Sequence, residues 1–201
     1  MSSVNLNELR DKTFQCSVVH GWHEKNLSDE HFLCLVISEL MEAVEADRKD
    51  NHADIKYYEN RISNSLICRG ILPSRPKEKG YEIAYRDFIK DTVEDELADA
   101  CIRLFDLSGL NDINLGEISM DELNDSYWFP YFSFTEYMYY FTSQLCNPEE
   151  IHLRTLDNVV RCTLKEILVF CVKRNIDIFW YIEQKIKYNQ SRDYKHGGKQ
   201  Y

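Results

Sequence analysis

Residues 28–50 read SDEHFLCLVISELMEAVEADRKD, and this stretch decides the fold class of the chain. Ser28 followed by two acids is typical of a helix start, because a capping hydroxyl and early carboxylates suit the free N–H groups of the first turn. Apolar side chains then recur at helical spacing, at Leu33, Val36, Ile37, Leu40, Met41 and Val44. The stretch therefore predicts an amphipathic helix that ends at about residue 50.

The same periodicity returns four more times along the chain. It predicts further helices over residues 54–68, 87–107, 153–175 and 176–187. Gly109 is expected to end the helix over 87–107, because glycine takes the left-handed cap conformation at no steric cost. Only 7 Gly and 4 Pro occur in 201 residues, which is too few turn-formers for an all-β sandwich or barrel. The sequence therefore predicts one all-α domain over residues 1–201, folded as a helical bundle.

Two segments interrupt the helical pattern. Residues 69–80 contain two prolines and two glycines and are expected to form a loop. Residues 110–150 are expected to form an insertion: a polar connection with one short helical turn, an aromatic block at 127–141, and a helix start at Pro148. The block holds ten of the chain's 26 Phe, Trp and Tyr residues. Because such side chains are enriched in both cores and interfaces, the block is core, a subunit interface or a lid over a ligand.

The composition narrows the class of protein further. The formal net charge is -10, which disfavours a broad phosphate-neutralising face for duplex DNA. Seven scattered cysteines with no Cys-x-x-Cys pair are typical of reduced thiols in a cytosolic protein. The N-terminus has no apolar segment of a secretory signal, and the longest apolar run, about 167–172, is far too short for a bilayer. We expect a cytoplasmic protein with no membrane or nucleic-acid partner.

Two pairs of acids carry the chemical information in this sequence. Glu39 and Glu42 lie three residues apart in the first helix, and Glu96 and Asp99 repeat that spacing in a later one. Each pair lies on one helix face, about 60° apart. Their neighbours on that face are small or apolar, with Arg103 as the single cation, as if the acids faced another helix.

Four carboxylates packed between helices repel one another and would take up protons unless a cation lay among them. Mg²⁺ prefers carboxylate oxygens together with substrate phosphates. The pattern therefore favours a Mg²⁺ site between two helices. The alternative is that acids are simply frequent, 34 in all, and that pairs at this spacing arise by chance.

At these residues the chain resembles the MazG-like all-α nucleoside triphosphate pyrophosphatases. That family carries a Glu-Glu-x-x-Glu segment and a later Glu-x-x-Asp segment on antiparallel helices, which the stretches 38–43 and 95–99 match. Ser38 stands where the pattern has its first glutamate, and Glu45 is a candidate replacement. After the last core helix, Lys185, Asn189 and Arg192, followed by residues 194–199, look like the family's basic phosphate-binding segment.

The resemblance implies Mg²⁺-dependent cleavage of a (d)NTP between the α and β phosphates, giving a monophosphate and pyrophosphate, with Mn²⁺ as a substitute metal. It implies metal-binding and catalytic roles for the four paired carboxylates, Glu39, Glu42, Glu96 and Asp99. Phosphate contacts are expected from Lys185, Asn189 and Arg192, and base contacts from Trp22 and His23. The family also implies a homodimer and an antiparallel helix core.

Two further residues near the acidic pairs have expected roles. Arg103 is expected to be a salt-bridge partner of Asp99 or Glu96, and Asp106 is expected to face solvent. The competing functional hypothesis is a helical nucleotide-binding or protein-interaction module without catalysis, which the missing glutamate at Ser38 and the insertions favour.

Overall fold

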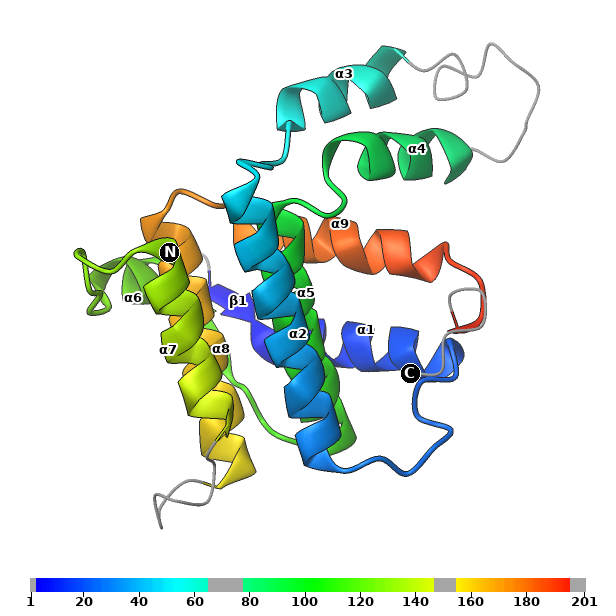
Figure 1. The fold of residues 1–201 in the computed structure, drawn as a ribbon. Helices are drawn as coiled ribbons and strands as arrows, with labels where there is room; N and C mark the ends of the chain where they lie inside the picture. The colour runs from blue at the N-terminus through cyan, green and yellow to red at the C-terminus, as the bar shows by residue number, and fades with distance from the viewer. Residues whose placement is uncertain (1–2, 65–77, 147–154, 196–201) are drawn as a thin grey trace.

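The computed structural model describes residues 3–64, 78–146 and 155–195. Among these residues it has nine helices and one two-stranded antiparallel sheet, arranged as a helical bundle (Figure 1). The helices are α1 (Leu6–Val19), α2 (Asp29–Arg48), α3 (Ile55–Asn64), α4 (Glu78–Phe88), α5 (Val93–Leu110), α6 (Met120–Asp125), α7 (Phe134–Cys146), α8 (Leu156–Lys173) and α9 (Ile178–Gln190). The strands are β1 (Ser3–Asn5) and β2 (Glu117–Ser119). The prediction of an all-α fold is confirmed.

Helix α5 lies at the centre of the bundle, with α2 antiparallel beside it (Figure 1). The N–H of Val93, at the start of α5, donates to the carbonyl of Asn51, just beyond α2, over 3.1 Å. At the opposite end, Nδ2 of Asn111 donates to Oδ1 of Asp29 over 3.0 Å. Helices α1 and α9 also pack against α5, which is why most of its side chains are buried.

The predicted helix over 87–107 is interrupted near its start by a turn. Helix α4 ends at Phe88, and α5 begins at Val93. Between them Asp91 has a φ of +61°, and Thr92 caps α5 by accepting a hydrogen bond from the Asp95 N–H at 3.3 Å. Apolar residues continue on both sides of this turn, so periodicity alone gave no sign of the break.

Gly109 does not end α5, contrary to the prediction. The helix continues to Leu110, and the left-handed conformation falls at Asp112, with a φ of +52°. A Cβ on Gly109 would lie 2.5 Å from the Cβ of Phe14 on α1. The glycine is therefore required for the close approach of α1 to α5 rather than for a cap.

Helix α1 and the small sheet have no counterpart among the sequence predictions. Asn5 caps α1 by accepting the Asn7 N–H at 3.0 Å. The buried residues of α1 are Leu6, Leu9 and Thr13 only. So narrow an apolar stripe gives a weak periodic signal, and the helix depends on its contact with α5.

The aromatic block lies partly in the core. Helix α7 packs on α2 and α8, and Tyr137 and Phe141 are buried there. Tyr127, Tyr131 and Tyr139 are 80%, 95% and 75% exposed. The core interpretation is confirmed for the inward face of α7, whereas the interface and lid interpretations stay predictions.

The two last predicted helices correspond to α8 and α9, and α3 covers the described part of the predicted helix over 54–68. The predicted helix start at Pro148 lies outside the described residues, as do most of the predicted loop and residues 196–199. In the described part of the chain no helix combines the length and apolarity that crossing a membrane requires.

Candidate functional site

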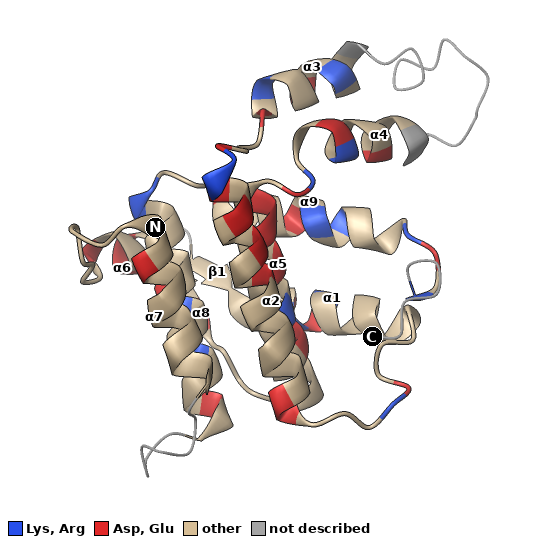
Figure 2. Ribbon diagram, viewed as in Figure 1, with Lys and Arg blue, Asp and Glu red and all other residues tan. Residues whose placement is uncertain are grey.

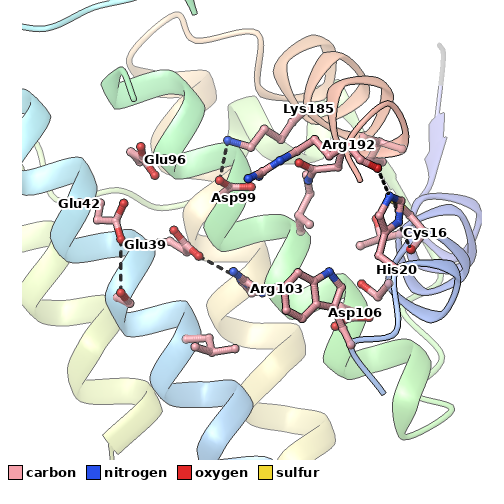
Figure 3. Close-up of a pocket in the computed structure, with 18 of the residues that line it drawn as sticks. Cys16, His20, Glu39, Glu42, Glu96, Asp99, Arg103, Asp106, Lys185 and Arg192 are labelled. Atoms are coloured by element: carbon pink, nitrogen blue, oxygen red, sulfur yellow. Dashed lines mark hydrogen bonds and ion pairs between the residues drawn. The ribbon is translucent and has the colours of Figure 1, made fainter. Parts of the chain in front are cut away.

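A cavity of about 310 Å³ lies where α2 and α5 face α1 and α9. Acidic residues gather on the adjoining parts of α2 and α5, and α9 carries basic residues toward them (Figure 2). The cavity brings together eight of the nine residues predicted to form the site, namely Trp22, Glu39, Glu42, Glu96, Asp99, Lys185, Asn189 and Arg192 (Figure 3).

Three carboxylates form the acidic centre of the cavity. Glu39 from α2 meets Glu96 and Asp99 from α5, and one oxygen of each lies within 4.8 Å of the others. Glu39 and Glu96 are buried, and Asp99 is 19% exposed. Carboxylate oxygens this close can hold a metal ion together.

Burial and mutual repulsion disfavour the ionised forms of two of these acids. Burial, followed by the charge of Asp99, raises the pKa of Glu96 to about 9. The same two causes raise the pKa of Glu39 to about 7, against the opposing effect of Arg103. A cation among the carboxylates would remove this cost, which makes the donor set suitable for a hard divalent ion.

Glu42 lies at the exposed edge of the acidic centre. It lines the cavity but is not one of the three converging carboxylates. The hydroxyl of Ser38 donates to Oε1 of Glu42 over 3.4 Å. The proposed replacement for the missing glutamate, Glu45, does not line the cavity, and its carboxylate pairs with Arg48 and Lys49 on the surface.

Arg103 is a salt-bridge partner, as expected, but of Glu39 rather than of Asp99 or Glu96. Its Nε lies 2.9 Å from Oε1 of Glu39. The pair joins α5 to α2 across the acidic centre (Figure 3). It neutralises one of the carboxylates without a metal ion.

Lys185 is buried between two aspartates rather than exposed for a phosphate. Its Nζ lies 2.8 Å from Oδ2 of Asp95 and 2.6 Å from Oδ2 of Asp99. Burial alone would lower the pKa of the ammonium, but Asp99 and Asp95 together outweigh it and raise that pKa. Asp95 is also fixed by the hydroxyl of Tyr85, which donates to Oδ1.

The other two predicted phosphate contacts lie at the opposite wall. Asn189 has a buried Oδ1 without a hydrogen-bond partner among the described residues. The guanidinium of Arg192 lies 5.8 Å from the ring centroid of Tyr188 and points toward the cavity (Figure 3). Both side chains can therefore meet a ligand in the cavity. Lys195, in the basic segment that follows, pairs with Glu24 at 2.6 Å.

The two residues predicted to contact the base lie in different surroundings. Trp22 lines the cavity, whereas His23 does not. Nε2 of His23 lies 2.8 Å from Oδ1 of Asp106, and its ring packs between Phe14 and Phe32. Asp106 is 4% exposed, so the prediction that it faces solvent is wrong. The histidine gives this buried acid its partner and is part of the packing behind the site.

Sequence reasoning missed three residues that shape the cavity. Asp95 pairs with Lys185 and accepts the hydroxyl of Tyr85. His20 ties α1 to the end of α9, with its ring nitrogens 2.7 Å from the Cys16 carbonyl and 3.0 Å from the Arg192 carbonyl. Asp95 directly precedes the second acidic pair, so its position was visible in the sequence. The other two were not visible in the spacing, because Tyr85 meets Asp95 only across the turn between α4 and α5, and His20 meets Arg192 only through the packing of α1 against α9.

In comparisons with known proteins, no family model, curated protein or solved structure matches this chain. The resemblance to MazG-like pyrophosphatases therefore stays a prediction.

Proposed function

We propose that this protein is a MazG-like, Mg²⁺-dependent nucleoside triphosphate pyrophosphohydrolase that acts in the cytoplasm. The observation that carries the proposal is the convergence of Glu39, Glu96 and Asp99 in a cavity whose other wall presents Asn189 and Arg192. An acidic centre facing hydrogen-bond donors is what a polyphosphate with a divalent ion requires.

The carboxylates fit a metal ion on chemical grounds. Glu39, Glu96 and Asp99 would hold it, with Glu42 at the edge of the same cavity. When bound, a divalent cation neutralises phosphate charge and lowers the pKa of a water molecule. Mn²⁺ accepts the same oxygen donors and is the expected substitute.

The residues of the chain then have distinct tasks. Glu42 is the best candidate to orient the attacking water and accept its proton, because its carboxylate is exposed whereas Glu39 is held by Arg103. The water oxygen bonds to a phosphorus of the α–β anhydride, and the bond from that phosphorus to the bridging oxygen breaks. Arg192 and Asn189 bind the pyrophosphate product.

Product analysis with a panel of nucleoside triphosphates, with and without Mg²⁺, tests the reaction. Monophosphate and pyrophosphate, formed only with Mg²⁺, are expected. Asp99→Asn should abolish this turnover and keep the helical circular dichroism. Asp157→Asn is the matched control, because Asp157 is a surface carboxylate on α8 that pairs with Arg161. Diphosphate with phosphate would overturn the cleavage position, and an active Asp99→Asn variant would overturn the metal assignment.

The second candidate is a module that binds nucleotides without cleaving them. Ser38 in place of the family's first glutamate favours it, as does the use of Glu39 by Arg103. Such a module would bind a nonhydrolysable triphosphate, and this binding would raise the melting temperature of the protein. It would release no product from any nucleotide in the panel.

We also propose a homodimer, as the family resemblance implies. The exposed aromatic rings of Tyr131 and Tyr139 offer a surface for it. Sedimentation of the wild type and of a Tyr131→Ser, Tyr139→Ser variant tests this. A monomeric wild type would contradict the proposal.

A further inference from the structure

A second group of carboxylates adjoins the acidic centre. Asp91, Asp95 and Glu96 also bring one oxygen each within 4.8 Å of the others. Glu96 belongs to both groups, so the two lie side by side along the start of α5. By spacing alone, the cavity could hold two neighbouring cations.

An ammonium group of the protein already lies at this second group, where it contacts Asp95 and also reaches Asp99 of the first group. Nζ of Lys185 lies 2.8 Å from Asp95 and 2.6 Å from Asp99. The two aspartates are four residues apart on α5 and therefore lie on one helix face, where a single group can bridge them. Lys185 is 5% exposed, and Figure 3 shows it reaching Asp99 from α9.

Both carboxylate oxygens of Asp95 already accept hydrogen bonds in this arrangement. Its Oδ1 accepts the hydroxyl of Tyr85, and its Oδ2 accepts both Nζ of Lys185 and the N–H of Asp91, the latter over 3.0 Å. Asp95 is fully buried, so a divalent ion could enter only by displacing the lysine. Asp99 differs, because Lys185 uses its Oδ2 and its Oδ1 can serve the first group.

We propose that Lys185 takes the place of a second divalent ion, so that each chain binds a single metal ion at Glu39, Glu96 and Asp99. Lys185 is thus a positioning residue that holds Asp99 by one oxygen and closes the second carboxylate group to metal. The inference rests on the metal site of the proposed function, and it adds the stoichiometry and the residue that sets it.

Counting bound Mn²⁺ by electron paramagnetic resonance tests the proposal. The wild type should bind one ion per chain. Lys185→Met, which keeps the length and apolar stem but removes the charge, should bind two, and its melting temperature should rise more with Mn²⁺ than that of the wild type. The matched control is Lys187→Met, an exposed lysine on the same helix, which should bind one ion.

The numbers of bound ions distinguish a failure of the role of Lys185 from a failure of the proposed metal site. Two ions in the wild type, or one in Lys185→Met, would overturn the role of Lys185 and leave the proposed function intact. No ion in the wild type would remove the metal site itself. One ion in the wild type and two in the variant, without any triphosphate cleavage, would support the inference and refute the enzyme. If Lys185→Met folds only with Mn²⁺, the ions bound to the refolded variant are counted, and the proposal still requires two per chain.

Discussion

The ion pair between Arg103 and Glu39 offers the sharpest test of the physical reasoning, because the chain contains a matched pair in a different environment. Nε of Arg103 lies 2.9 Å from Oε1 of Glu39, and Nε of Arg161 lies 2.9 Å from Oδ1 of Asp157. The Glu39 side chain is 10% exposed, whereas that of Asp157 is 42% exposed. The two pairs therefore share one nitrogen–oxygen distance and differ in the burial of the acid.

The expected cost of replacing Arg103 by methionine follows from that difference. Breaking a fully buried pair costs about 3–5 kcal/mol, because it leaves one charge uncompensated. Arg103 is itself 34% exposed, and Glu39, with a pKa already near 7, can take a proton instead. We therefore expect a loss of about 2 kcal/mol, or roughly 4–8 °C in melting temperature for a protein of this size. Arg161→Met should cost less than about 1 kcal/mol.

Thermal unfolding followed by circular dichroism at pH 8 measures both variants against the wild type. At pH 8 Glu39 is ionised in the wild type, so the contrast between the variants is greatest. At pH 5.5 the carboxyl is protonated and the cost of Arg103→Met should shrink. Equal shifts for Arg103→Met and Arg161→Met at pH 8 would refute the argument from burial.

Three further outcomes are expected. The pKa of Glu96 is raised to about 9 in the folded state, so the folded protein holds a proton that the unfolded chain releases near pH 4.5. Without metal, the free energy of unfolding should therefore fall between pH 5 and 9, by at most about 1.4 kcal/mol per pH unit. Denaturant titrations that show a rise over this range would contradict the prediction. Gly109→Ala would place a Cβ 2.5 Å from the Cβ of Phe14, which is fixed to the α1 backbone. Overpacking should outweigh the gain in helix propensity and lower the free energy of unfolding, measured by chemical denaturation, by about 1–2 kcal/mol. A stabilised variant would show that α1 can move away from α5 freely. Tyr85→Phe removes the hydroxyl that donates to buried Asp95 and should cost about 1–3 kcal/mol, and an unchanged melting temperature would mean that this hydrogen bond is dispensable.

Much of the fold could be predicted from residue spacing. Helices α2, α8 and α9 were expected near their observed positions, because each has a continuous apolar face against the core. Helix α1 and the break before α5 were not expected. Helix α1 has few buried residues of its own. The break depends on a positive φ at Asp91, and nothing in the sequence distinguishes this aspartate from one in an ordinary helix.

The candidate site was predictable as a set of residues but not as a set of contacts. Acids at i and i+3 must share a helix face, so the sequence by itself determined that Glu39 and Glu42, and Glu96 and Asp99, would each point in one direction. Their apolar neighbours further indicated that these faces meet another helix. This is local information, which the chain carries in its spacing.

Only the tertiary structure decided how the charges pair. Lys185 reaches Asp99 across 86 positions of sequence, Arg103 selects Glu39 on another helix, and His23 gives the buried Asp106 its partner. Each pairing depends on how helices cross, because the energy of a charge in the interior is set by the groups within a few ångströms of it. Spacing along one helix fixes which way an acid faces, and the packing of the other helices fixes what it meets.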